Sequence, residues 1–187
     1  MKTPSKSRRQ KQLTKTAYHE AGHAVALWEL KFKIKKATIV PKGNTAGGVS
    51  HGHVHLGRLE GETPPIGKRL SRIHDSLVVA FAGEEAQRRF DPRSLRRDEL
   101  AGDREWSSKL LALLHGDNGD NGREVFYAGQ YLRTRARNLV NRNWRQVEDL
   151  AKALLERKTL SGQEAQEVLQ ASLVQEIEEN VEALPDA

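Results

Sequence analysis

The segment TAYHEAGHAVA, residues 16–26, decides the fold, because it places two histidines four positions apart with a glutamate after the first. On a helix with about 3.6 residues per turn, His19 and His23 project from nearly the same face and can bind one metal ion. Glu20 lies about 100° further round the axis, where its carboxylate can reach a water on that ion. The flanking residues are mostly apolar, and histidines within a buried helix need partners. The segment therefore favours a metal-binding helix over two histidines on a solvated face.

The composition limits how such a metal could be held. The chain has 187 residues, enough for one domain with a sizeable core. Hydrophobic residues make up 37% and charged residues 30%, a balance that favours helices with broad solvated faces over a thick sheet. There is no cysteine, so a disulfide framework and a thiolate zinc site are excluded, and zinc would need histidine and carboxylate ligands.

The charge and hydropathy of the chain bear on its partners and its location. No apolar run approaches the roughly 20 residues that span a bilayer, and no signal-type apolar stretch follows the basic start MKTPSKSRRQKQ. We therefore expect no membrane span and a cytoplasmic location. The net charge of +6 is spread among acidic residues, as is typical of a solvated surface, so we expect no nucleic-acid partner.

Hydrophobic periodicity predicts a mainly α fold of the α+β class. The expected helices cover residues 13–32, 68–90, 101–114, 124–140, 143–158 and 161–173. Residues 36–41 and 48–57 have the β-branched residues and flanking turn chemistry of two strands, which predicts a small β-hairpin beside the histidine helix. Ser161 and Glu164 predict a capping box for the last helix.

The two ends of the chain differ in charge from the rest. Residues 1–13 are basic and are expected to form a disordered tail, whereas residues 176–187 are acidic and are expected to fray. Residues 14–175 are expected to form one domain, because no internal repeat or long linker divides them.

The pattern of residues alone does not identify a third metal ligand. A catalytic zinc usually has three protein ligands and one position open to water or substrate. The downstream carboxylates that could complete the set are Glu84, Glu85, Asp98, Glu99 and Asp103, beside several lone histidines.

Five segments, in order along the chain, resemble the peptidase domain of the FtsH-type, AAA-associated zinc metalloproteases. They are TAYHEAGHAVA, KATIVPKGNTAGGVSH, LVVAFAGEEAQ, LAGDREWSSKLLALL and VEDLAKALLERKTLSGQEAQEVL, and together they extend over roughly residues 14–170. The resemblance implies a helical, zincin-like metallopeptidase domain in which His19, His23 and Asp103 hold Zn²⁺ and Glu20 is the catalytic base. Asp103 would open a helix, where its negative charge suits the terminus.

The sequence also departs from that family. Where the family has paired acids near the end of its apolar helix, this chain has Gln87 and Arg88, and Glu84 and Glu85 are out of register. FtsH-type proteases carry a membrane anchor and an ATPase module before the peptidase, whereas a short basic tail precedes it here, and GETPPIGKR at 61–69 lacks phosphate-loop spacing. We therefore expect a stand-alone domain, either ATP-independent or served by a separate unfoldase, that is a monomer or a smaller homo-oligomer than the family's ring of six.

The segment SHGHVH places three histidines on one face of a strand, because side chains alternate along it. The resemblance puts this strand at the edge of the active cleft, where an extended peptide could add as another strand. A plain edge strand and an accessory metal site are the alternatives. The expected substrate-binding residues are Gly48, Val49, Ser50 and His51.

These features together predict a zinc-dependent endopeptidase that hydrolyses unfolded or extended polypeptides without an ATPase of its own. Glu20 would take a proton from a water in the fourth position and pass it to the leaving amine. The alternative is a non-catalytic regulatory or adaptor relative with the same fold. The intact Glu20 argues against that alternative, because a scaffold does not require it.

Overall fold

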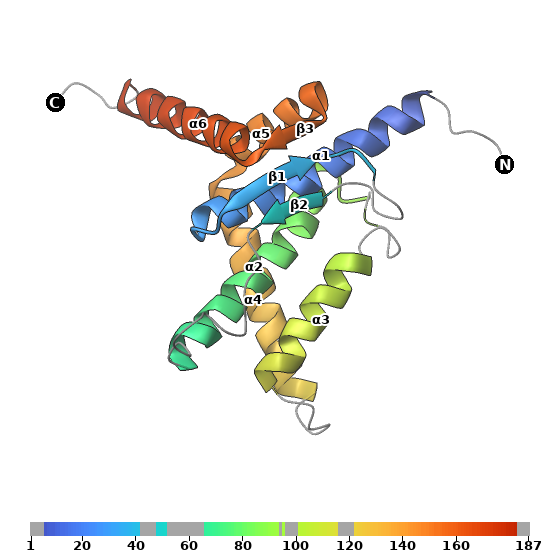
Figure 1. Cartoon of the computed structure of the whole chain (residues 1–187), viewed down its shortest axis with the longest axis vertical. Coiled ribbons are helices and arrows are strands. Elements are labelled where there is room, and N and C mark those ends of the chain that lie inside the picture. The colour runs from blue at the N-terminus through green and yellow to red at the C-terminus, as the bar shows by residue number, and fades with distance from the viewer. Residues whose placement is uncertain are drawn as a thin grey trace.

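The computed structural model describes residues 6–41, 48–51, 66–93, 95, 101–115 and 122–182, and this part of the chain contains six helices and three short strands (Figure 1). In chain order they are α1 (Lys6–Glu29), β1 (Ile34–Thr38), β2 (Gly48–His51), α2 (Ile66–Phe90), α3 (Ala101–His115), α4 (Gly122–Arg142), α5 (Trp144–Arg157), β3 (Thr159–Ser161) and α6 (Gly162–Glu182). The predicted class, mainly helical with a small sheet, is confirmed.

The helices α1 and α2 pack closely against each other at the centre of the molecule. A Cβ atom on Gly22 of α1 would lie 2.5 Å from the carbonyl oxygen of Ala82 and 2.6 Å from Cβ of Ala86, both on α2. Ala21 and Ala24, one and two residues from Gly22 along α1, are fully buried as well. Small residues therefore let the two backbones approach each other, and the histidines of α1 lie inside the fold as a result.

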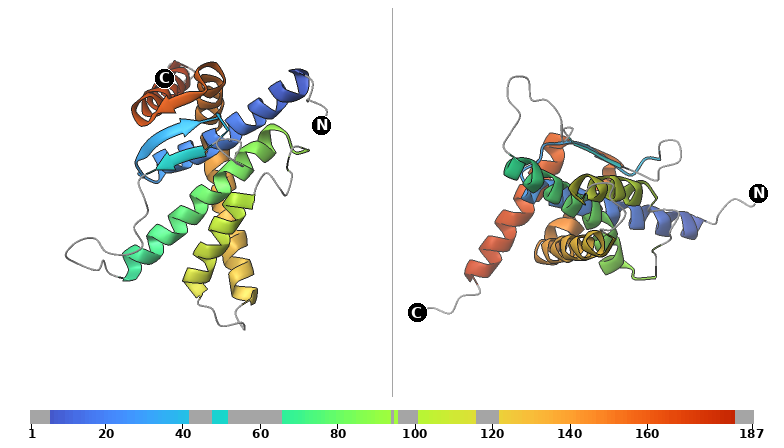
Figure 2. Two further views of the ribbon diagram at one scale, coloured as in Figure 1. Left: turned by 45° about the vertical axis from the view of Figure 1, so that its right-hand side comes forward. Right: turned by 90° about the horizontal axis from the view of Figure 1, so that it is seen from below.

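The sheet has the order β2-β1-β3, and both pairings are antiparallel. Ala37 at the centre of β1 pairs with Val49 of β2 on one side and with Leu160 of β3 on the other. The β1–β2 pair is the predicted hairpin, and the sheet lies against α1 (Figures 1 and 2). The third strand was not predicted, because a three-residue strand between two helices has no periodicity of its own.

The start of α6 joins the last helices to the sheet. The predicted capping box is confirmed, since the Ser161 N–H donates to Glu164 Oε2 at 2.8 Å and the Glu164 N–H donates to Ser161 Oγ at 3.2 Å. Gly162 begins the helix where a Cβ atom would overlap the carbonyl group of Ile34 in β1. This glycine therefore lets α6 begin directly against the sheet.

Aromatic side chains pack α1 against α2 and α5. The ring of Tyr18 stacks on Phe90 at the end of α2, with centroids 3.9 Å apart, and on Trp144 at the start of α5 at 5.6 Å. The Arg89 guanidinium covers the Trp144 ring at 4.2 Å. In contrast, α3 and α4 run side by side away from the sheet (Figures 1 and 2).

Two helices extend further than their sequence patterns predicted. α1 begins at Lys6, so residues 6–13 are helical where a disordered tail was expected, and α6 continues to Glu182. Lysine, arginine, glutamine and glutamate are good helix formers, so a helix with a well-packed middle can continue into charged turns without a core contact. The domain boundaries at 14 and 175 stay a prediction.

The apolar stretches of the helices are short. The longest helix, α2, has 25 residues, but it carries charged residues at both ends and Glu84 and Glu85 in between. Within the described ranges, no helix combines the length and the apolar character that crossing a bilayer requires.

We expect Gly22→Ala to destabilise the protein, because its methyl group would overlap the Ala82 carbonyl. Overpacking of this kind costs about 1–3 kcal/mol of unfolding free energy. The matched control is Gly129→Ala in α4, where a Cβ atom meets only Leu111 at an ordinary 3.6 Å and alanine favours the helix. Urea denaturation followed by circular dichroism compares the two variants, and equal midpoints would contradict the proposed close approach.

Candidate metal centre

His19 and His23 of α1 point their Nε2 atoms toward Asp103 in the first turn of α3. Asp103 Oδ2 lies 2.8 Å from His19 Nε2 and 3.3 Å from His23 Nε2, and the two Nε2 atoms are 3.1 Å apart. Among the described residues, these three form the group whose ligand atoms are close enough to share a metal ion. The structure thus brings the three predicted ligands together, whereas two other candidate acids, Asp98 and Glu99, lie outside the described residues.

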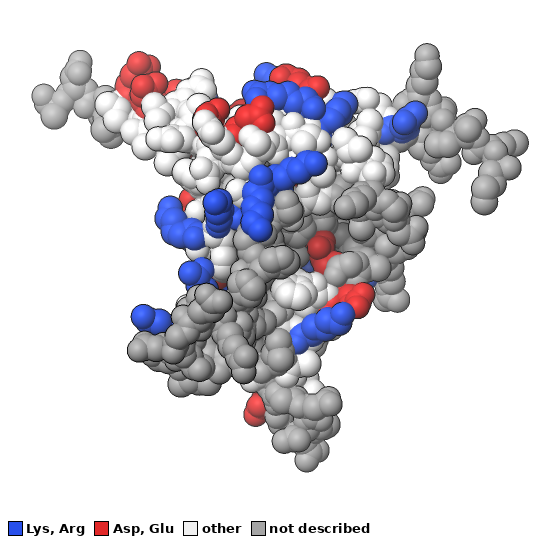
Figure 3. Space-filling model, viewed as in Figure 1, with Lys and Arg blue, Asp and Glu red and all other residues white. Residues whose placement is uncertain are grey.

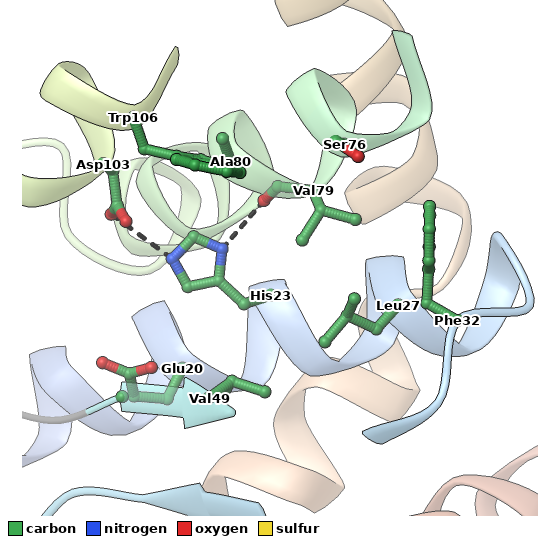
Figure 4. Close-up of a pocket in the computed structure, with 11 residues that line it drawn as sticks. Glu20, His23, Leu27, Phe32, Val49, Ser76, Val79, Ala80, Asp103 and Trp106 are labelled. Atoms are coloured by element: carbon green, nitrogen blue, oxygen red, sulfur yellow. Dashed lines mark hydrogen bonds and ion pairs between the residues drawn. The ribbon is translucent and has the colours of Figure 1, made fainter. Parts of the chain in front are cut away.

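The orientation of His23 is fixed by its neighbours on α2. Its Nδ1 lies 2.8 Å from the carbonyl oxygen of Val79, so the Nδ1–H group donates to that oxygen and Nε2 is left to bind a ligand (Figure 4). A Cβ atom on Gly83 would lie 2.6 Å from Cε1 of the same ring. The imidazole therefore occupies space that only a glycine leaves open.

The donor set fits a zinc ion. Two imidazole nitrogens and one carboxylate are the ligands of a catalytic zinc with one open position. Bonds of about 2.0–2.1 Å in tetrahedral geometry separate ligand atoms by roughly 3.3 Å. The three observed separations run from 2.8 to 3.3 Å, so small side-chain movements would accommodate the ion.

The electrostatics of this group favour a positive charge between the side chains. Burial lowers the pKa of His23, but the negative charges of Asp103 and Glu20 and the hydrogen bonds to Asp103 and Val79 outweigh it and raise the pKa to about 9. Burial disfavours the charged form of Asp103 as well and so raises its pKa. The positive charge of His23 and the hydrogen bonds to both histidines outweigh burial and hold the pKa of Asp103 well below its usual range. A divalent cation would supply the positive charge that these groups stabilise.

Glu20 faces the same space from the next position on α1. Its side chain is buried, at 5% exposure, and it lines the cleft with His23 and Asp103. Burial raises the pKa of its carboxyl group, Asp103 raises it further, and the two histidines lower it in part. A carboxyl group with a raised pKa can both take up and give back a proton near neutral pH.

A cleft of about 170 Å³, open to solvent, continues from this centre between α1, β2, α2 and α3. Glu20, His23 and Asp103 lie at one end, and Leu27 and Phe32 lie at the other (Figure 4). Its apolar walls are formed by Leu27, Phe32, Val49, Val79, Ala80 and Trp106. Val49 is an expected substrate-binding residue, whereas the other five were not predicted to belong to the site, because helical periodicity does not distinguish a cleft wall from a core position.

The predicted substrate-binding strand is β2, which lies at the edge of the sheet. Gly48 and Val49 line the cleft, and the backbones of Ser50 and His51 pair with Lys36 and Ile34 of β1. The side chains of Ser50 and His51, and residues 52–65 with the other two histidines of SHGHVH, lie outside the described part of the structure. Pairing of a substrate with this strand stays a prediction.

Glu84 and Glu85, the remaining candidate ligands, pair with arginines instead. Glu84 Oε1 accepts from Arg88 at 2.6 Å and lies 2.9 Å from Arg133 Nη1, while Glu85 Oε2 accepts from Arg137 at 3.0 Å. Both carboxylates are buried, so each needs such partners. Arg88, a departure from the family pattern, is thus compensated by Glu84 from the same helix.

Two histidines and a glutamate on one helix, completed by an aspartate from another, define a site of the zinc metallopeptidase type. Residues 6–55 match the model of Peptidase family M41. The ATP-dependent zinc metalloprotease FtsH of Neorickettsia risticii is 29% identical over 195 residues, which cover 87% of this chain and 29% of that protein. The ATP-dependent zinc metalloprotease YME1L1 of Mus musculus is 28% identical over 184 residues, which cover 86% of this chain and 25% of that protein.

The resemblance to FtsH-type peptidases that the sequence showed is confirmed by the match to Peptidase family M41 and by these relatives, which are similar over most of this chain. A further FtsH, from Rhodothermus marinus, is 25% identical over 180 residues. The chain spans less than a third of the length of these curated relatives.

We expect Gly83→Ala to weaken zinc binding about 10–100-fold, because its methyl group would push the His23 ring away from the other ligands. Competition with a colorimetric chelator measures the affinity. Gly67→Ala, at the exposed start of the same helix, is the control, since a Cβ atom there meets nothing within 4 Å. Equal zinc affinities of the two variants would show that His23 is not a ligand.

Zinc binding should also be pH-dependent, because the ion must displace the proton from His23, whose pKa is about 9. Below that pH the affinity should fall by up to about tenfold per pH unit, and above it the dependence on this group should vanish. Calorimetry at pH 7 in buffers of different ionisation enthalpy should detect release of about one proton per zinc. Zinc uptake without proton release would contradict this assignment.

Proposed function

We propose that this chain is a zinc-dependent endopeptidase that hydrolyses unfolded or extended polypeptides. The observation that carries the proposal is the convergence of His19, His23 and Asp103 at one end of a cleft that also contains the buried Glu20. The match to family M41 supports the same conclusion, because the similar proteins are named as zinc metalloproteases.

The residues of the chain divide the chemistry between them. A divalent ion held by the two histidines and the aspartate would supply Lewis acidity toward a peptide carbonyl and a water molecule. Glu20 takes a proton from the attacking water and delivers it to the amine of the leaving peptide. The raised pKa of its buried carboxyl group suits both transfers. The carbonyl of Val79 keeps the His23 ring in the orientation that the site needs.

The shape of the cleft supports an extended substrate. One wall includes β2, which is an edge strand of the sheet among the described residues, so its outer backbone groups can pair with an added strand. The apolar end around Leu27 and Phe32 would accept an apolar side chain of the substrate close to the scissile bond. A folded surface cannot pair with an edge strand in this way, so unfolded polypeptides are the proposed substrates.

We further propose that hydrolysis of peptides that are already unfolded needs no ATP, and that a separate unfoldase would serve only folded substrates. The cleft is open to solvent, so a flexible peptide can enter it directly. The cytoplasmic location and the oligomeric state stay predictions. The alternative function is a regulatory or adaptor role without turnover, which the structure would allow but which gives Glu20 no task.

Glu20→Gln separates these two functions. If the chain is a peptidase, this isosteric change should lower the rate of casein hydrolysis without ATP by about 10²–10⁴-fold, because the proton acceptor is lost. The zinc content, measured by elemental analysis, should remain one ion per chain. Asp103→Ala is the companion variant and should lose both zinc and activity. A zinc-loaded wild-type chain that hydrolyses no faster than Glu20→Gln would favour the adaptor role.

A further inference from the structure

Positively charged residues neighbour Phe32, at the apolar end of the cleft, either in the sequence or by direct contact. Lys31 and Lys33 flank Phe32 in the sequence, and the guanidinium carbon of Arg72 lies 4.9 Å from the centroid of the Phe32 ring. All three cations are exposed, as are the two lysines that follow in β1. We call this set the basic rim, and its members are Lys31, Lys33, Lys35, Lys36 and Arg72.

A bulge in β1 allows two neighbouring lysines to face solvent. In the β1–β2 ladder Ile34 pairs with His51 and Lys36 pairs with Ser50, so one extra residue, Lys35, is inserted. Regular alternation would turn either Lys35 or Lys36 toward the core. With the bulge both are exposed, while Ile34 and Ala37 stay buried. The fold thus keeps both positive charges beside β2.

The basic rim is not neutralised by the described part of the chain. No described carboxylate lies within 4.0 Å of the charged nitrogen atoms of these five residues, whereas many other arginines in the fold are paired. Lysine and arginine side chains gather across the middle of the face in Figure 3, over β1 and the turn before it. A local excess of this kind attracts an anionic ligand to the adjoining cleft.

An acidic segment of a bound peptide would come within reach of the rim. A peptide paired with β2 would lie roughly 10 Å from β1, since neighbouring strands are 4.7–4.9 Å apart. Lys36 is directly opposite Ser50 of β2, and its long side chain can extend across that strand. At the apolar end, Arg72 covers Phe32, past which the peptide would leave the cleft, and Lys33 directly follows Phe32 in the sequence.

We propose that the basic rim binds acidic residues of the polypeptide substrate, in the segment that leaves the cleft past Phe32. That the bound polypeptide is a substrate rests on the proposed function, but binding of an acidic peptide to the rim does not require hydrolysis. A nucleic acid fits less well next to the rim, because proteins hold single strands by stacking bases on free aromatic rings and the ring beside the rim, Phe32, is covered by Arg72. An acidic peptide uses both the rim and the edge strand.

The test measures binding to the full-length, zinc-loaded Glu20→Gln variant by fluorescence anisotropy. Three labelled peptides share an apolar centre and carry four aspartate, asparagine or lysine residues in the following segment, and a single-stranded oligonucleotide has the same charge as the acidic peptide. The acidic peptide should bind about tenfold tighter than the neutral one at low salt, and the difference should shrink above about 0.15 M salt. Equal binding of these two peptides, or tighter binding of the oligonucleotide, would overturn the proposal.

Variants of the rim show which residues act. Lys33→Gln with Lys36→Gln should weaken binding of the acidic peptide about three- to tenfold, since each exposed pair contributes modestly. Lys33→Glu with Lys36→Glu should instead favour the lysine peptide. Arg9→Gln with Lys152→Gln changes the net charge equally at exposed positions on α1 and α5 and should have no effect. If this control weakens binding as much as the rim variant, the attraction comes from net charge and the rim is not a site.

Hydrolysis by the wild-type chain separates failure of this proposal from failure of the proposed function. If both hold, the acidic peptide should have a lower KM than the neutral peptide at a similar kcat. If neither peptide is hydrolysed but the acidic one still binds better through Lys33 and Lys36, the result supports the proposed rim and contradicts the proposed peptidase function. If both peptides are hydrolysed with equal KM and bind equally, the result contradicts the proposed rim and supports the peptidase function.

Discussion

The close approach of α1 and α2 is the constraint on which the rest of the structure depends. Gly22 lets α1 reach the backbone of α2, and Gly83 leaves room in α2 for the His23 ring. The Nδ1–H group of that ring then donates to the carbonyl of Val79, so one helix orients a predicted metal ligand of the other. Each glycine is unfavourable in a helix interior by about 1 kcal/mol. One of them allows the helices to pack closely, and the other makes room for a predicted metal ligand.

The sequence was sufficient for the parts that follow from local spacing. His19 and His23 share a helix face because of helical geometry, and the Ser161–Glu164 box marks a helix start by its own chemistry. Asp103 could be chosen among the acids only through the family resemblance, since 84 residues separate it from His19 and no periodicity links them.

Other features could not be predicted, because they depend on contacts between distant segments. β3 has three residues and becomes a strand only by pairing with β1, which lies more than a hundred residues earlier in the chain. Glu84 and Glu85 were candidate ligands by residue type, yet Arg133 and Arg137 of α4 hold them away from the metal centre. The bulge at Lys35 likewise appears only in the ladder with β2.

The position of β1 in the middle of the sheet also orders the assembly of the site in time. β2, which borders the cleft, is supported by β1, and β1 receives its second set of hydrogen bonds from β3 at Thr159–Ser161. While the chain is being translated, the histidine helix and the first hairpin leave the ribosome long before this last strand. A nascent chain therefore contains the predicted histidine ligands early but completes the sheet only after β3 has been synthesised, so the cleft beside β2 forms late.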